Sequence, residues 1–143
     1  MSRSGYTDDC ENLAMWRGAV NSSIRGKRGQ AFLKEMLAAL DAMPVKELVA
    51  NDLERDGQVC ALGCVGKARG LDHSAIDPEE SEVVAEKFGV ARALACEIMY
   101  ENDEGYWNPS GWKATETPEG RWQRMRAWVA KHIRQEESDG TDR

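Results

Sequence analysis

Apolar positions recur at helical intervals along most of the chain. In the first such segment they are Leu13, Trp16, Val20 and Ile24. Asp8 and Glu11 have the spacing of a capping box, in which each residue bonds an otherwise unpaired N–H at the start of a helix. The pattern predicts a first helix from Asp9 to Arg25, which Gly26 ends.

A broad apolar stripe follows the GKRG sequence at 26–29. Its members are Phe32, Leu33, Met36, Leu37, Leu40 and Met43. They predict a second helix that Pro44 closes, because proline cannot supply an N–H to the next turn. Between 45 and 58 the apolar runs are too short to separate helix from strand, although Asp56-Gly57 is typical of a tight turn. We expect a loop there, with at most one short strand pair.

Four further helices are indicated by their end signals. A short one from Cys60 ends at Gly70, and another begins with the cap Asp77-Pro78 and stops at Gly89. Val90, Leu94 and Ile98 carry the next helix, which ends near Asn102, and Thr117-Pro118 opens the last. Between these two helices, residues 103–116 predict a loop packed through Tyr106, Trp107 and Trp112.

These elements predict a mainly α fold, a single compact bundle-like domain of five to six helices. We expect the helical domain over 9–135, a flexible N-terminus over 1–8 and a disordered tail over 136–143, where no residue has an apolar face to bury. The expected core residues are Leu13, Trp16, Phe32, Met36, Leu37, Leu62, Leu94, Ile98, Trp122 and Val129.

Composition narrows the class of protein. The 143 residues are 41% hydrophobic, enough to fill a core at this length without a metal or a disulfide. No apolar run approaches the roughly 18 residues of a membrane span, and the start of the chain lacks the apolar core of a signal peptide. We therefore expect a cytoplasmic protein, not bound to membranes, whose four cysteines are free thiols.

Charge is segregated along a chain whose net charge is −6. Residues 12–34 carry +5 and residues 121–134 carry +5, whereas residues 72–104 carry −8. The simplest explanation is that basic and acidic helices pack side by side, with their charged faces in solvent and ion pairs along the edges where they meet. The alternative is a basic surface for an anionic partner and an acidic surface for a cationic one.

The candidate binding residues for an anionic partner or nucleic acid lie on the polar edges of the first and last helices. They are Arg17, Arg25, Lys27, Arg28, Arg121, Arg124, Trp128 and Lys131. The last four fall at spacings of three, four and three, away from the apolar stripe, so an exposed Trp128 among cations could stack on a base or anchor a protein interface. The alternative is that Trp128 lies over a neighbouring helix with the cations around it.

Catalytic and metal chemistry is weakly indicated. Cys60 and Cys64 share a helical face, and Cys96, His73 or His132 could complete a zinc site, but the usual paired-knuckle spacing is missing. Buried packing of the thiols is favoured over metal binding and over thiol catalysis. The carboxylates at 101–104 suit a helix end better than a cation site. We expect no metal, no cofactor and no enzymatic activity.

Several blocks of sequence resemble a known group. They are SGYTDD, WRGAVNSSIRGKRGQAFLKEMLAALDAMP, VCALGCVGKARGLD, IMYENDEG and TPEGRWQRMRAWV. Together, over about residues 4 to 130, they are similar to small proteins of unassigned function found in tailed phages and prophages of proteobacteria. The resemblance implies an origin and carries no catalytic or ligand-binding residue over to this chain.

A phage origin implies a class of function, because small accessory phage proteins commonly bind and block a component of the host. The resemblance favours a non-enzymatic interaction protein in the host cytoplasm, such as an inhibitor of a host nuclease or of a CRISPR-type defence complex. Its partner would be a host or defence-system protein. The alternative is a nucleic-acid-binding accessory protein that uses the basic edges of the first and last helices. Nothing in the sequence indicates the oligomeric state.

Overall fold

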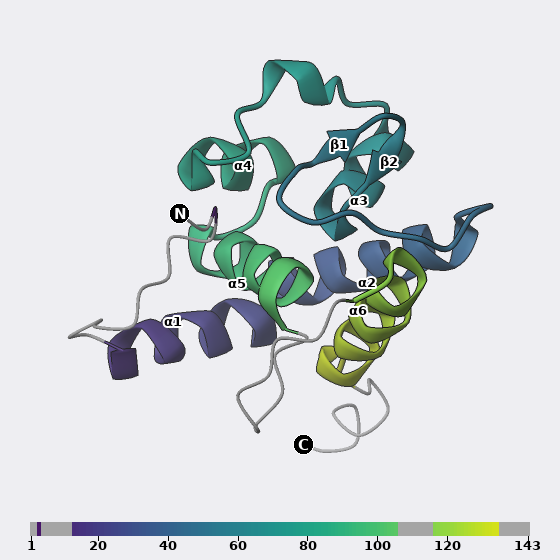
Figure 1. The fold of residues 1–143 in the computed structure, drawn as a ribbon. Helices are drawn as coiled ribbons and strands as arrows, with labels where there is room; N and C mark the ends of the chain where they lie inside the picture. The colour runs from purple at the N-terminus through teal and green to yellow at the C-terminus, as the bar shows by residue number, and fades with distance from the viewer. Residues whose placement is uncertain (1–2, 4–12, 106–115, 135–143) are drawn as a thin grey trace.

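The protein is a bundle of six α-helices with one two-stranded hairpin, seen in a computed structural model that describes Arg3, residues 13–105 and residues 116–134 (Figure 1). The elements run in the order α1 (Leu13–Arg25), α2 (Lys27–Ala42), β1 (Glu54–Arg55), β2 (Gln58–Val59), α3 (Ala61–Arg69), the 3-10 turn η1 (His73–Ala75), α4 (Ser81–Phe88), α5 (Arg92–Glu104) and α6 (Pro118–His132). The predicted mainly α fold with at most one strand pair is confirmed.

Helices α2 and α5 make most of the contacts between helices. Helix α5 lies between α4 and α1, and α2 contacts α1, α3 and α6 (Figure 1). The shared core contains Phe32, Met36, Leu62, Leu94, Ile98, Trp122 and Val129, as predicted, together with Leu33, Leu40 and Leu48. Trp16 and Leu37 are only partly buried against it.

Local signals placed most helix ends correctly. Gly70 and Gly89 adopt φ of 80° and 74°, the left-handed conformation that ends α3 and α4 and that glycine takes without strain. Thr117 caps α6, with its side chain accepting a hydrogen bond from the N–H of Gly120. The antiparallel strands are joined by Asp56 and Gly57, both at positive φ, as a type I′ hairpin turn requires.

Three predicted boundaries were wrong. Helix α2 begins at Lys27, inside the GKRG sequence, because only Gly26 leaves the helical conformation. Helix α4 begins at Ser81 because the Asp77 carboxylate accepts the Glu79 N–H, which forms a separate turn before the helix. Helix α5 continues to Glu104, so the predicted loop over 103–116 starts later.

Some predictions fall on residues that the structure does not describe. The predicted tail over 136–143 and the three loop aromatics, Tyr106, Trp107 and Trp112, lie outside the described residues. Of the segment 1–8, only Arg3 is described, and its side chain is buried against Asp103.

Candidate functional site

Exposed cations stand at three helix ends that lie together in the fold. Arg25 closes α1, Lys27 and Arg28 open α2, and Lys131 lies in the last turn of α6. We call these four exposed residues the basic corner. The sequence predicted them on two separate helix edges, about 100 residues apart.

The Gln30 side chain connects the three helix ends. Its amide nitrogen donates to the carbonyl of Ile24, at 2.7 Å, and to that of His132, at 3.0 Å. Its amide oxygen accepts the N–H of Arg134 at 2.8 Å. These bonds close the ends of α1 and α6 onto the first turn of α2, so one residue joins the two basic edges into a single surface. Sequence reasoning missed Gln30; the only signal was a lone amide just after the GKRG sequence.

The side chains of the basic corner make no bond within the part of the chain that the structure describes. Throughout the described ranges, Arg25 and Arg28 are the two arginines whose side chains make no hydrogen bond or ion pair, and the side chains of Lys27 and Lys131 make none either. Internal ion pairing therefore does not explain why these charges are present.

The position of Lys27 and Arg28 is unfavourable for the helix itself. They stand in the first turn of a 16-residue helix, where unpaired N–H groups already create partial positive charge. That turn contains no acid, and its N-cap, Gly26, has no side chain to accept a hydrogen bond. An anion placed here would bind both the cations and the helix end, so the sequence suits a negatively charged partner better than it suits the isolated helix.

Two of the predicted binding arginines are turned inward. Arg121 is 9% exposed, and it donates to the carbonyls of Asn102 and Leu48, both at 3.1 Å. Arg124 makes a bidentate bond to Glu116 at 2.7 and 2.9 Å and also donates to the Asn102 carbonyl. The expected cationic face along α6 is corrected, because these guanidiniums bind carbonyls at the end of α5.

Arg17 and Trp128 are likewise engaged within the fold. Arg17 holds Glu97 through two bonds of 2.8 and 3.1 Å. Trp128 is half-buried against the core, and its ring is tilted over the imidazole of His132 with ring centres 4.6 Å apart. Trp128 is therefore not the exposed aromatic of the first interpretation, because it packs against the core as a half-buried side chain. Of the eight predicted residues, the four of the basic corner are those whose side chains make no hydrogen bond, ion pair or ring contact among the described residues.

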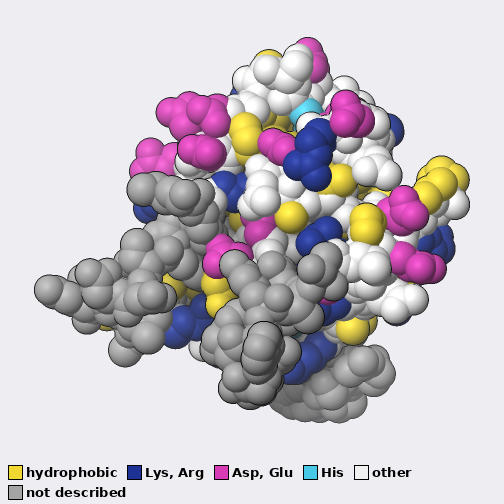
Figure 2. Space-filling view, viewed as in Figure 1, with side chains coloured by type: hydrophobic (Ala, Val, Ile, Leu, Met, Phe, Trp, Pro, Cys, Tyr) yellow, Lys and Arg dark blue, Asp and Glu magenta, His cyan; other side chains and the backbone are white. Residues whose placement is uncertain are grey.

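The acidic segment divides into an exposed and an internal part. Asp and Glu side chains gather over α4 (Figure 2). The exposed acids of the segment are Glu82 and Glu86 on α4, with Asp72, Asp77, Glu79 and Glu80 in the 3-10 turn and the residues before this helix. Glu97 and Asp103 are buried instead and pair with arginines. The exposed charge is thus polarised, with acids over α4 and unpaired cations at the basic corner.

The Asn102-Asp103 pair is a buried polar node that the sequence did not reveal. Asn102 accepts the N–H of Ala61 at 3.1 Å and donates to the carbonyl of Val49 at 2.9 Å. The Asp103 carboxylate accepts the N–H of Asn51 at 3.0 Å. The node ties the end of α5 to the start of α3 and to the loop before the hairpin, so Asp103 is used structurally rather than as a cation ligand.

The three described cysteines and His73 lie in the interior of the fold. Cys60, Cys64 and Cys96 are buried free thiols, and the Cys60 sulfur caps α3 by accepting the Gly63 N–H. Burial, with the neighbouring Cys60, raises the pKa of Cys64 to about 12. Nδ1 of the buried His73 lies 2.9 Å from a carboxylate oxygen of Glu54. Within the described ranges, no three His, Cys, Asp or Glu side chains are arranged to hold a metal ion.

Comparison of the chain with protein-family models, with curated proteins and with solved structures gives no match. No helix in the described residues is both long and apolar enough to cross a bilayer.

Proposed function

We propose that this chain is a non-enzymatic interaction protein whose basic corner docks on an acidic surface of another protein. The observation that supports the proposal is a set of four exposed cations at three helix ends. Their side chains make no bond among the residues that the structure describes. The resemblance to phage proteins suggests where the partner belongs: a host or defence-system protein in the host cytoplasm, whose activity the complex blocks.

The distribution of charge favours a protein partner over a nucleic acid. Four cations are few for a surface that must hold a duplex, and the chain as a whole carries −6. The acids over α4 would repel any long polyanion that extends across the molecule. A protein with its own mixture of charges can place acids on the basic corner and bases near α4, which orients the complex as well as attracting it.

The test is affinity capture from phage-infected host lysate, with and without nuclease. The bait variant Arg25→Ala/Lys27→Ala/Arg28→Ala removes three charges from the basic corner. The matched control Arg55→Ala/Lys87→Ala/Arg92→Ala removes the same number of exposed cations elsewhere. We expect a partner protein that survives nuclease, is kept by the control and is lost by the corner variant. Equal capture by both variants would refute the role of the corner.

Nucleic-acid binding is the second candidate, favoured by the way Gln30 joins the basic edges of the first and last helices. Four phosphate contacts would give a slope of about −3.6 for log affinity against log salt on duplex DNA. Fluorescence anisotropy with duplex and single-stranded DNA over a salt series measures that slope. Lys131→Ala added to the corner variant should flatten it, and absence of binding at low salt would eliminate this candidate.

A further inference from the structure

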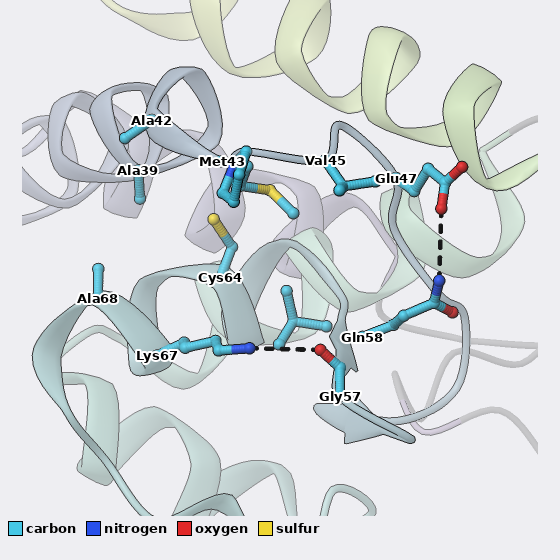
Figure 3. Close-up of a pocket in the computed structure, with 12 residues that line it drawn as sticks. Ala39, Ala42, Met43, Val45, Glu47, Gly57, Gln58, Cys64, Lys67 and Ala68 are labelled. Atoms are coloured by element: carbon cyan, nitrogen blue, oxygen red, sulfur yellow. Dashed lines mark hydrogen bonds between the residues drawn. The ribbon is translucent and has the colours of Figure 1, made fainter.

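An apolar groove of about 550 Å³ lies between the end of α2, the loop that follows it, the hairpin and α3 (Figure 3). Small residues form its sides, Ala39 and Ala42 from α2 and Ala68 from α3. The thiol of Cys64 points into it toward Met43 (Figure 3). The small side chains leave this surface hollow, and its volume is in the range that binds a ligand or an inserted side chain.

A protruding apolar side chain stands on the edge of this groove. Val45 is 60% exposed, and together with Met15 it is one of two large hydrophobic side chains exposed in the described part of the chain. Met15 lies on α1, away from the groove lining. The protruding Val45 side chain therefore lies beside the apolar groove, and a side chain of this shape could insert into such a groove on another molecule.

The polar rim of the groove carries opposite charges at its two ends. Gln58 donates its amide N–H to Glu47 at 3.3 Å, and Lys67 donates to the carbonyl of Gly57 at 3.3 Å (Figure 3). Gly57 and Gln58 are neighbours in the hairpin, so the rim runs from the Glu47 carboxylate to the Lys67 ammonium. Each group keeps bonding capacity, one more carboxylate oxygen and two more N–H groups.

We propose that a second copy of this chain covers the groove in a two-fold symmetric dimer. A two-fold axis through the groove exchanges the ends of the rim, so Glu47 of each copy faces Lys67 of the other. The same rotation places Val45 of each copy over the hollow of the other. The surface is thus complementary to itself in both charge and shape, which is the requirement for an interface made of the same patch on two subunits.

Charge reversal in the full chain, followed by analytical ultracentrifugation over a concentration series, tests the pairing. Glu47→Lys and Lys67→Glu alone each place like charges opposite one another twice per dimer. We expect each to raise the dimer Kd about tenfold. An equimolar mixture of the two variants should recover the wild-type affinity as a heterodimer, as should the double variant. If reversal leaves the Kd unchanged, or the mixture does not recover it, the proposed geometry is wrong.

Val45 and Met15 supply a matched pair for the apolar contact. Val45→Asp should abolish the dimer, whereas Met15→Asp, which changes the other exposed hydrophobic side chain, should leave it unchanged. Circular dichroism verifies that both variants fold. Wild-type protein that stays monomeric at sub-millimolar concentration would overturn the proposal, and the groove would then be assigned to a different occupant. The triple variant of the basic corner should dimerise normally, so the outcome is independent of the proposed function.

Discussion

Arg3 and Asp103 form a buried bidentate ion pair across 100 residues of sequence. Their bonds are 2.7 and 2.9 Å long, and the two side chains are 2% and 4% exposed. Asp103 is also the acceptor for the N–H of Asn51. A residue near the start of the chain therefore completes the polar node that joins α5 to the loop before the hairpin.

Loss of Arg3 should destabilise the protein strongly. Arg3→Ala leaves the Asp103 carboxylate buried without its charge partner, and breaking a buried pair on one side costs about 3–5 kcal/mol. Urea denaturation measures the free energy of unfolding. The control is Arg55→Ala, which breaks the exposed pair with Asp52 and should cost under about 1 kcal/mol. Similar losses in the two variants would show that the Arg3 pair is not anchored as described.

Gly66 should not tolerate alanine. A Cβ at this position would overlap Nε2 of the buried His73, so the imidazole must move and give up its contact with Glu54. Glycine to alanine inside a helix normally stabilises by about 1 kcal/mol, and Gly18→Ala on α1, where nothing lies within 4 Å, should show that gain. Thermal unfolding should therefore shift down for Gly66→Ala and up for Gly18→Ala. The double variant Gly66→Ala/His73→Ala should lose less than the sum of its parts.

The three described cysteines should resist alkylation in the folded protein. Burial raises the pKa of the Cys64 thiol to about 12 and also raises that of Cys96, so these two thiols form little thiolate at pH 8. Cys60 is fully buried and out of reach of the reagent. Iodoacetamide followed by peptide mass spectrometry should find Cys60, Cys64 and Cys96 unmodified in buffer and modified in urea. Rapid native labelling of Cys64 would contradict this burial.

A chelator should leave the melting temperature unchanged.

Glu101 should make stability depend on pH. Burial, followed by the nearby Glu97, raises the pKa of its carboxyl, against the opposing effect of Arg124, His132 and Arg17. The folded protein then holds this proton more tightly than the unfolded chain. Stability contributed at this site accordingly falls as pH rises from the ordinary glutamate pKa through the raised value. Glu101→Gln should raise the melting temperature at pH 7 to 8 relative to wild type and lose that advantage at pH 3 to 4.

The pH dependence of the Glu101→Gln effect separates the charge of the carboxylate from its packing. A variant equally stabilised at both pH values would mean that packing of the amide, and not the charge, is responsible. Glu104→Gln on the same helix serves as the control for removing one negative charge.

Short-range signals in the sequence determined the fold class and most element ends. A glycine that must adopt positive φ, a Thr-Pro cap or an Asp-Gly turn acts within four or five residues, so Gly70, Gly89, Thr117 and the hairpin turn could be predicted from neighbours alone. The apolar periodicity likewise identified most of the core, since a helix turns the same face inward at every repeat.

Only the tertiary structure decided which charges are available to a partner. Arg25 and Arg121 read alike in the sequence, as cations on the polar edge of a helix. The Arg25 side chain is exposed and makes no bond among the described residues, whereas the Arg121 side chain is buried and donates to the carbonyls of Leu48 and Asn102. The difference arises because the fold places carbonyl groups of distant segments against the Arg121 guanidinium and none against that of Arg25 in the described residues. The same long-range packing, through Gln30, joined two basic edges into one corner, and no local pattern encodes such a contact.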